Sequence, residues 1–401
     1  MRINHMSYKF SSLAIFCFIL FFLNSFLSIV VFSICAIQKK DTFSHYFTWG
    51  FLFALFVSVV NASKVPTNDL AMYLDYYHQS KYLSFNQYIY ILGNWGKDIL
   101  YLAYTWILHL IIGDSDKIFV FAMSFTSYIF FLEALLIACK SLKLNTTSIL
   151  LCFAVLFFHP YIFSTSAHIL RQTIAFSITT YVLAKKIFEH KNLWYIGIIA
   201  ALFHGSVLFF IPFLFFNILY QPITIKKVLI ISLLAGSSIS LKALLHQLQK
   251  TGLPVSFFDF ALQRAIDGTT FDTTLDFKQI LFSLFIILMM FSLMYIKNTS
   301  LKNITSFNFF LNLTAILFIF ILINKESGEL QLRFNIFLWQ LHPFFAAFFL
   351  AAFNHIKSST KILFTLLFFA SWVIYNRLFS PWKYECGNFF WLYPAFMYFM
   401  P

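Results

Sequence analysis

An arginine stands at the start of a long apolar run, in the segment HILRQTIAFSI. If this run is helical, His168, Arg171 and Gln172 lie on or near one face. No acidic residue lies within one helical turn of Arg171 to neutralise its charge. Guanidinium binds phosphate through two parallel hydrogen bonds, and a helix N-terminus adds positive character. We therefore interpret Arg171, His168 and Gln172 as anion-binding residues, with a snorkelling interfacial arginine as the alternative.

A histidine interrupts a second apolar segment, AALFHGSVLFFIP. His204 could donate a hydrogen bond to a phosphate or a sugar, or move a proton near neutral pH. The alternative is a histidine that forms hydrogen bonds between two membrane helices. We keep His204 as a candidate catalytic residue.

A third candidate is the segment PTNDLAMYLDYY, whose first residues are typical of a helix start. In a helix, Asp69, Tyr73 and Tyr77 share one face at four-residue spacing. Carboxylates bind sugar hydroxyls and aromatic planes stack on sugar rings, so this face could hold a glycan. The alternative makes Asp69 an N-cap and the tyrosines an interfacial belt. Asp75 and Asp98 are weaker candidates.

The fourth candidate is the segment NKESGELQLRF. Glu329 and Arg333 are four residues apart, so an ordinary ion pair along a helix is one interpretation. Our working hypothesis is that Arg333 and Arg171 converge on one diphosphate. Arg264, between Asp259 and Asp267, is more typical of a salt-bridged surface helix.

The elements that position these residues are predicted to be membrane helices. The chain has 401 residues, of which 60% are hydrophobic and 11% charged, with a mean hydropathy of +0.80. A soluble domain has about a quarter of its residues charged, so we predict an all-α, polytopic integral membrane protein of one domain, 1–401. Apolar stretches predict about 11 to 13 transmembrane helices. The predicted spans lie near 10–37, 44–61, 118–139, 146–163, 168–187, 193–219 (interrupted at FHGS), 228–246, 278–296, 304–323, 333–354 and 361–378.

Two longer loops, 62–97 and 247–277, separate these spans, and 98–113 reads as a re-entrant or interfacial helix. Thirteen lysines fall in six short loops, and the positive-inside rule makes that face cytoplasmic: Lys39, Lys40, Lys140, Lys143, Lys185, Lys186, Lys191, Lys226, Lys227, Lys297, Lys302, Lys357 and Lys361. The five arginines fall at or beside the opposite, periplasmic face, with the two long loops: Arg2, Arg171, Arg264, Arg333 and Arg377. Arginines on the outer face indicate an anionic ligand there, and a lipid-linked pyrophosphate fits best.

The sequence lacks the motifs of several common enzyme and nucleotide-binding classes. The sequence contains no P-loop, GxGxxG, HExxH or GxSxG segment. No acidic pair is typical of a divalent-metal site, and the five cysteines lack ligand spacing. We therefore predict no cofactor, no metal and no nucleic-acid partner.

Three segments in order resemble a known family: DLAMY, LRQTIAFSITTYVLAKKIF and AALFHGSVLFFIPF. They are similar to the Asp-x-x-x-Tyr, Arg-Gln-x-[ILV]-Ala and Phe-His-x-Ser pattern of EpsG/Wzy-type polysaccharide polymerases, and LRFNIF resembles their late arginine segment. The resemblance implies that Asp69, Arg171 and His204 are catalytic. It also implies that Gln172 and Arg333 bind substrate, and we add His168, Tyr73 and Glu329 from their positions. Relatives often open the helix after the Asp-Tyr segment with glutamate, where this chain has Lys97-Asp98.

The resemblance implies a glycosyltransferase of the bacterial inner membrane with its active site facing the periplasm. Such proteins polymerise oligosaccharide repeat units linked to undecaprenyl pyrophosphate, for O antigen, capsule or exopolysaccharide. Expected partners are this lipid-linked oligosaccharide, membrane lipid, a chain-length regulator and a flippase. The alternatives are an O-antigen ligase, a GT-C-type enzyme, or a flippase for the same lipid-linked units.

Overall fold

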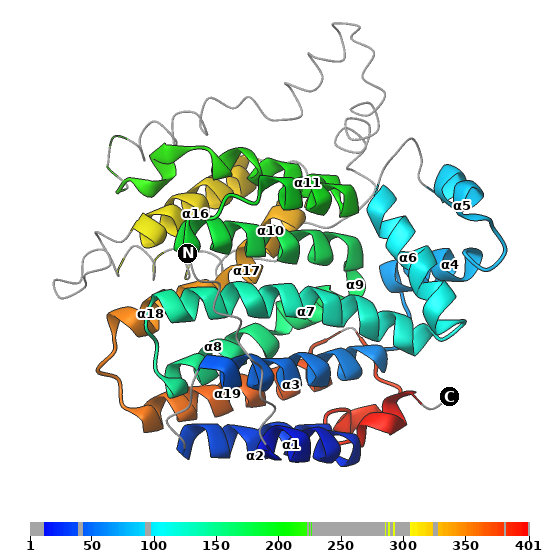
Figure 1. The fold of residues 1–401 in the computed structure, drawn as a ribbon, viewed down its shortest axis with the longest axis horizontal. Helices are drawn as coiled ribbons and strands as arrows, with labels where there is room; N and C mark the ends of the chain where they lie inside the picture. Colours follow the sequence, from blue (N-terminus) through cyan, green and yellow to red (C-terminus); the bar gives the residue numbers. More distant parts are fainter. Residues whose placement is uncertain are drawn as a thin grey trace, which may run out of the picture. The chain divides into compact units, whose positions relative to one another are not determined.

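The computed structural model describes residues 12–38, 43–92, 98–222, 305–323, 328–380 and 382–399, with single positions at 224, 226, 285, 288 and 292. Over these residues the regular elements are fifteen α-helices and several short 3-10 helices, with no strand (Figure 1). The predicted all-α fold is confirmed. The predicted loop 247–277, with Arg264, lies outside the described residues.

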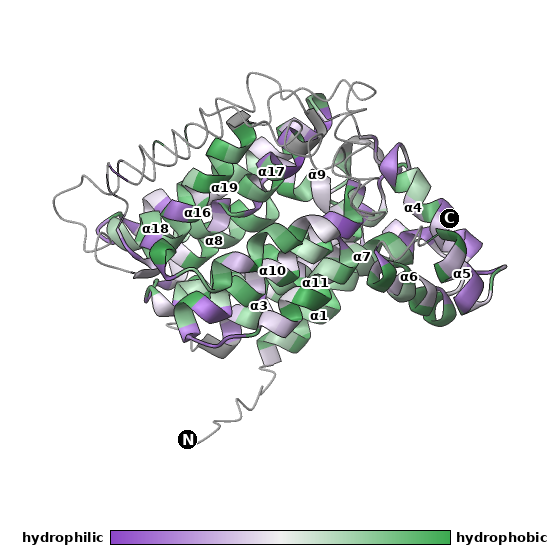
Figure 2. Ribbon diagram, turned by 90° about the horizontal axis from the view of Figure 1, so that it is seen from above, coloured by the Kyte–Doolittle hydropathy of each residue, from purple (hydrophilic) through white to green (hydrophobic). Residues whose placement is uncertain are grey.

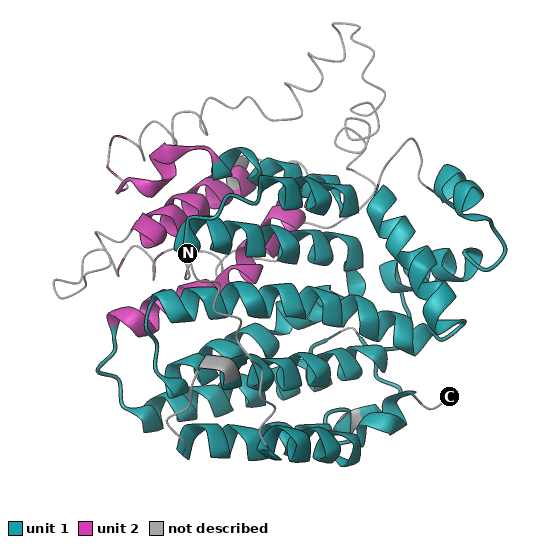
Figure 3. Cartoon of the chain, viewed as in Figure 1, with its two compact units in different colours: residues 1–214, 353–401 teal, residues 215–352 magenta. Residues whose placement is uncertain are grey.

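The chain divides into two compact units (Figure 3). Unit 1 comprises residues 1–214 and 353–401, and unit 2 comprises 215–352. Unit 1 contains α1 (Ser12–Leu23), α2 (Ser25–Gln38), α3 (Phe43–Ala62), α4 (Asp69–Gln79), α5 (Phe85–Leu92), α6 (Ile99–Ile112), α7 (Asp116–Ser141), α8 (Thr146–Phe157), α9 (Pro160–His168), α10 (Leu170–Glu189), α11 (Trp194–Phe203) and α19 (Ser358–Leu378), with 3-10 helices η1 (Gly205–Phe210), η2 (Pro212–Leu214), η5 (Gly387–Phe389) and η6 (Ala395–Phe399). Unit 2 contains η3 (Asn217–Tyr220), α16 (Thr305–Ile323), α17 (Gly328–Gln340) and α18 (His342–Ala352).

Several of these helices are long and apolar enough to cross a bilayer. Four candidate spans are His45–Ala62, Asp116–Ser141, Gln331–Ala352 and Ser358–Leu378. The pair α8 and α9, bent by 48°, makes a fifth if it counts as one span. Hydrophobic residues dominate these helices, whereas α5 carries more polar ones (Figure 2). The chain is thus a multi-pass membrane protein, and the count of 11 to 13 stays a prediction because 228–246 and 278–296 lie almost wholly outside the described residues.

The core of unit 1 forms where α3, α7 and α10 pack side by side (Figure 1). Gly50 allows α3 to approach α7, since a Cβ there would lie 2.2 Å from a methyl of Leu132. Asn61 of α3 donates two hydrogen bonds of 2.8 Å, to Ser124 of α7 and to Ser166 of α9. Small residues and buried polar cross-links are what hold helices together in lipid. This packing fixes the ends of α3, α7 and α9 relative to one another.

Unit 1 has two ends of different character. At one end the Tyr46 and Thr146 hydroxyls are 2.9 Å apart, and Lys361 donates to Ser148 over 2.7 Å, so α3, α8 and α19 all begin there. We call this the lysine end, because the helix termini there carry most of the clustered lysines of unit 1: Lys140, Lys143, Lys185, Lys186, Lys191, Lys357 and Lys361. At the other end, Glu385 pairs with Lys117 over 2.8 Å, and its amide donates to the Ser63 carbonyl. We call it the Arg171 end, since α10 begins there.

One predicted span differs from the structure. The predicted span 10–37 is two helices folded against each other at Asn24, because the Ser28 hydroxyl donates to the Cys17 carbonyl over 2.6 Å. Eleven residues of a straight helix would separate these groups by about 16 Å. The predicted long segment 62–97 contains α4, whose start at PTND was expected, and α5. The helix expected at 98–113 is present as α6.

Candidate anion-binding site around Arg171

The helix break at Ile169 places Arg171 in the first turn of α10. Ile169 has φ −124° and ψ 56°, which are not helical values, so α9 ends at His168 and α10 begins at Leu170. The Thr165 carbonyl accepts from the Ile169 amide over 2.9 Å and from the Thr173 hydroxyl over 3.0 Å, so these bonds bridge the break. Arg171 therefore stands where the α10 dipole is positive, which favours a bound anion.

Asp98 forms an ion pair with Arg171 across 73 residues of sequence. Nη1 of Arg171 donates to Oδ2 of Asp98 over 2.5 Å, and the side chains are 23% and 13% exposed. Asp98 occupies the N-cap position of α6 in a left-handed conformation, φ 52°, yet its side chain does not cap that helix. A non-glycine residue in this conformation is uncommon and is retained where the surroundings require it. The carboxylate thus serves Arg171 instead of its own helix.

Two tyrosines complete the surroundings of the guanidinium. Nε of Arg171 donates to the Tyr73 hydroxyl over 3.5 Å, and the guanidinium carbon lies 5.3 Å from the Tyr73 ring centre and 5.9 Å from that of Tyr101. Both rings are buried. Cation–π contacts of this length stabilise a partly desolvated charge. Nη2 donates to no described residue, so one edge of the guanidinium stays available to an anion.

Asp69 begins α4, the helix that carries Tyr73. Asn68 is the N-cap residue, at φ 49°, and its side chain makes no capping bond, so the alternative of Asp69 as N-cap is wrong. Asp69 is exposed and lies one helical turn from Tyr73. Tyr77, one turn further on, is buried and stacks on Phe119 at 4.3 Å. Asp69 and Tyr73 therefore remain candidates near Arg171, whereas Tyr77 is a packing residue.

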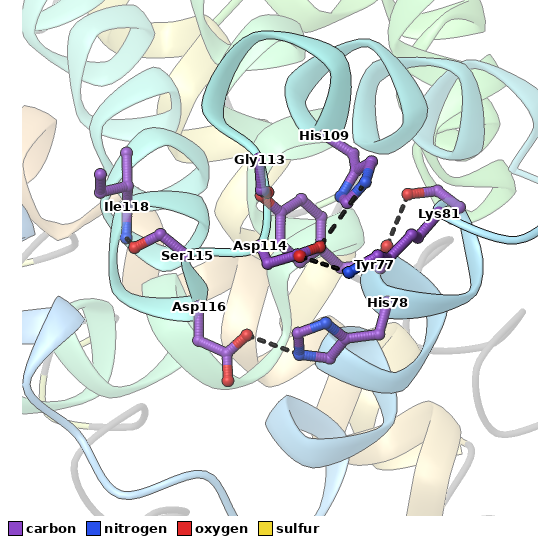
Figure 4. A network of polar contacts seen from close by, with 10 residues as sticks. Tyr77, His78, Lys81, His109, Gly113, Asp114, Ser115, Asp116 and Ile118 are labelled. Atoms are coloured by element: carbon purple, nitrogen blue, oxygen red, sulfur yellow. Dashed lines mark hydrogen bonds and ion pairs between the residues drawn. The ribbon is translucent and has the colours of Figure 1, made fainter. Parts of the chain in front are cut away.

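A network of polar contacts fastens α4 to the loop between α6 and α7 (Figure 4). Lys81 pairs with Asp114 over 2.5 Å, and His78 pairs with Asp116 over 2.7 Å. The Tyr77 hydroxyl donates to the Gly113 carbonyl. The contacts bridge a gap of some 35 residues in sequence, so they hold the C-terminal end of α4 while its N-terminal half faces Arg171.

The pKa shifts of this network follow from its contacts. The hydrogen bond from Lys81 holds the pKa of Asp114 below its usual value, and the same bond raises the pKa of Lys81. Burial, with Asp116 and Asp114 nearby, raises the pKa of Tyr77 to about 12. At neutral pH the network therefore holds a carboxylate, an ammonium and a neutral phenol.

His168 does not share the Arg171 environment. The expected common face fails because the chain breaks at Ile169, between His168 and Arg171. The His168 ring stacks on Trp382 of the C-terminal segment, with ring centres 3.2 Å apart. Gln172 is buried, with 1% of its surface exposed. Sequence periodicity therefore grouped side chains that the break directs to different neighbours.

His204 lies at the break expected in FHGS. It follows the last residue of α11 with φ −160°, and η1 begins at the next residue. Its Nδ1 accepts from the Ser206 amide over 3.2 Å and lies 2.8 Å from the Ser206 hydroxyl. These local bonds orient the imidazole.

Arg333 and Glu329 lie on α17 in unit 2. Arg333 is half-buried, and the Glu329 side chain lies outside the described residues. Convergence of Arg333 with Arg171 stays a prediction. Within the described part of the chain, no three His, Cys, Asp or Glu side chains gather closely enough to hold a metal ion.

The sequence predicts Asp98 only as a weaker candidate and assigns no role to Lys64, a buried lysine just after α3. A signal for Asp98 was present, since it stands where relatives often have a glutamate. A signal for Lys64 was its position after an apolar run, away from the clustered lysines.

Comparison with known families assigns the chain to a family. The model of the EpsG family matches residues 47–393, from α3 to the C-terminal segment. The chain belongs to the EpsG family. The match includes Asp69, Asp98, Arg171, His204 and Arg333. Neither the curated proteins nor the solved structures yield a match. The chain is therefore an EpsG-family membrane protein of polysaccharide biosynthesis.

Proposed function

We propose that this EpsG-family protein polymerises oligosaccharide repeat units linked to undecaprenyl pyrophosphate at the periplasmic face of the bacterial inner membrane. The observation that carries the proposal is the Arg171 guanidinium, anchored by Asp98 and Tyr73 with one edge available. An anchored, partly desolvated guanidinium at a helix N-terminus suits a leaving diphosphate. The product is a surface glycan such as O antigen, capsule or exopolysaccharide.

The reaction moves a growing glycan from one lipid to the next repeat unit. A hydroxyl oxygen of the acceptor sugar attacks the anomeric carbon of the donor. The bond from that carbon to the pyrophosphate oxygen breaks, and the pyrophosphate leaves with the electron pair. Arg171 stabilises the charge that grows on the departing oxygen, and Arg333 assists if it reaches the same diphosphate.

A base must take the proton of the acceptor hydroxyl, and we assign this role to Asp69 or His204. Asp69 is exposed near Tyr73, and His204 is oriented by Ser206. Asp98 is less suited, because an ion-paired carboxylate is a weak base. We treat Asp98 as a positioning residue that holds the guanidinium. Gln172, His168, Tyr73 and Glu329 remain proposed substrate-binding residues.

The test uses purified protein in proteoliposomes, with lipid-linked repeat units added from outside to protein of the matching orientation. Polymer formed without translocation of the lipid supports a polymerase and cannot arise from a flippase. The Arg171→Gln variant should insert normally and form no long-chain product. Arg377→Gln is the matched control, because Arg377 is an exposed arginine near the end of α19. Long-chain product from Arg171→Gln at the wild-type rate would refute the proposal.

A further inference from the structure

Lys64 is a buried cation just beyond the end of α3. Its side chain is 3% exposed, its ammonium group donates to the Phe163 carbonyl over 3.3 Å, and it lies 4.1 Å from the centre of the Phe163 ring. No carboxylate among the described residues forms an ion pair with it. Burial lowers the pKa of this ammonium group well below its usual range. A buried ammonium group without an anion beside it lowers the stability of the fold, because its desolvation is not compensated.

His168 is the second buried polar group at this place. It is 4% exposed, and neither ring nitrogen has a hydrogen-bond partner among the described residues. His168 and Lys64 lie against the same segment, since Trp382 stacks on His168 and the Lys383 carbonyl accepts from Val65, the residue after Lys64. Trp382 covers the face of the ring and leaves the nitrogens at its edge unoccupied. A buried lysine without a carboxylate partner beside a buried imidazole without a hydrogen-bond partner is uncommon in folded proteins and indicates a ligand.

The cover over both groups is residues 382–386, which we call the C-terminal strap. The Trp382 indole donates to the Ser164 hydroxyl over 2.8 Å. Two backbone hydrogen bonds, from Val65 to Lys383 and from Glu385 to Ser63, are 2.9 and 2.8 Å long. The half-exposed pair of Lys117 and Glu385 adds little to its stability. The Tyr384 hydroxyl donates to Asn376 over 2.7 Å, and its ring stacks on Phe390 at 4.2 Å. All of these contacts must open to uncover Lys64.

We propose that Lys64 and His168 form a second anion subsite beneath the C-terminal strap, which takes the diphosphate of the second lipid-linked substrate. The proposal rests on the proposed function, because polymerisation brings two lipid diphosphates together, one on the donor and one on the acceptor. Arg171 serves one of them. His168 is three residues from Arg171 across the break at Ile169, so the two subsites are neighbours.

The chemistry of the subsite suits a diphosphate. Its oxygens accept hydrogen bonds from the Lys64 ammonium and from the imidazole N–H of His168. Its negative charge compensates the lysine, which has no carboxylate partner. The break at Ile169 explains why His168 and Arg171 serve different anions: it directs one toward the strap and the other toward Asp98.

The test counts bound farnesyl diphosphate, a soluble polyprenyl diphosphate, on the purified full-length protein by calorimetry. We expect two equivalents on the wild type and one on Lys64→Met, which keeps the length of the side chain without its charge. Lys191→Gln, an exposed lysine at the lysine end, is the matched control and should keep two. Two equivalents on Lys64→Met would overturn the proposal.

Further arms separate this proposal from the function proposed above. Arg171→Gln should lose the other equivalent, and the double variant should lose both. Loss in Lys64→Met without loss in Arg171→Gln would leave the Lys64 subsite and remove the Arg171 role. Inorganic pyrophosphate should also fill the Lys64 subsite, whereas farnesol should not. Farnesol binding that disappears in Lys64→Met would refute an anion subsite.

The strap can be locked with one substitution. The Glu385 amide donates to the Ser63 carbonyl over 2.8 Å and Cys386 is the next residue, so Ser63→Cys places two thiols on facing segments. Oxidation of this variant with oxidised glutathione, checked by thiol titration, should reduce two equivalents of farnesyl diphosphate to one. Reduction should restore the second, and the wild type should not respond. Two equivalents on the fully oxidised variant would show that the strap does not control the subsite.

Discussion

Two ion pairs of equal length lie near α4, and they differ in how far water reaches them. Arg171 and Asp98 are 2.5 Å apart with side chains 23% and 13% exposed. Lys81 and Asp114 are also 2.5 Å apart, but with side chains 47% and 52% exposed. Because the two distances are equal, any difference in what the pairs contribute to stability comes from their burial.

The difference shows what each pair does. Water screens the Lys81–Asp114 pair, so it contributes little stability and serves to align α4 with the loop. The Arg171–Asp98 pair is partly desolvated, so removal of either partner leaves a costly charge. A charge held at such cost is useful where a ligand of opposite sign must be stabilised.

The largest effect is expected at Arg171. Arg171→Ala should lower polymerisation by about 10³-fold, since it removes a preorganised donor to the leaving diphosphate. Arg171→Lys should recover little, because a point charge lacks the two-pronged geometry of guanidinium. Glycan chain length on gels and rates in proteoliposomes are the measurements. A lysine variant with wild-type chain lengths would contradict the bidentate role.

Next comes Asp98. Asp98→Ala should destabilise unit 1 by about 3 kcal/mol, because it leaves a partly buried guanidinium without its partner. Adding Arg171→Met to this variant should recover part of the loss, since the unpaired charge is then absent. Denaturant unfolding in detergent measures both. Strictly additive losses would show that the pair does not couple.

A smaller effect is expected at Tyr73. Tyr73→Phe removes a hydroxyl that accepts a long hydrogen bond of 3.5 Å, so the affinity of Arg171 for farnesyl diphosphate should change by less than about 1 kcal/mol. Tyr73→Leu also removes the ring beside the guanidinium and should lower the affinity for farnesyl diphosphate further. If Tyr73→Phe were the more harmful of the two, the hydroxyl would contact substrate directly.

The smallest effect is expected at the exposed pair, and it depends on pH. Lys81→Ala should leave the melting temperature unchanged at pH 7 and keep polymerisation. The pKa of Asp114 is lower in the folded protein than in the unfolded chain. Its contribution to the stability of the loop is therefore present above the unfolded pKa of about 4 and is lost as the pH falls through the folded pKa. The pKa of Lys81 is raised in the folded protein. Its contribution to the stability of the loop is therefore full below the unfolded pKa of about 10.4 and is lost as the pH rises through the folded pKa. Hydrogen exchange of residues 109–118, compared between the wild type and Lys81→Ala, measures both limits. A difference between the two proteins that disappears near pH 7 would contradict them.

Much of the fold followed from composition and hydropathy. The all-α membrane class, the break at FHGS, the short helix at 98–113 and the start of a helix beside Arg171 are all present. These features are local, since apolar length and breaker residues decide them. The prediction of a single span over 10–37 was wrong, because the chain turns at Asn24 and the Ser28 hydroxyl bonds to the Cys17 carbonyl.

The sequence by itself determined that Arg171 is a solitary cation beside an apolar run and that the protein is made of membrane helices. Only the tertiary structure decided which groups surround that cation. Asp98 and Tyr73 reach Arg171 from separate helices, and the C-terminal strap reaches His168 from more than 200 residues away. The physical reason is that helix periodicity is a local property, whereas the partners of a buried charge come from whichever segments the packing brings beside it.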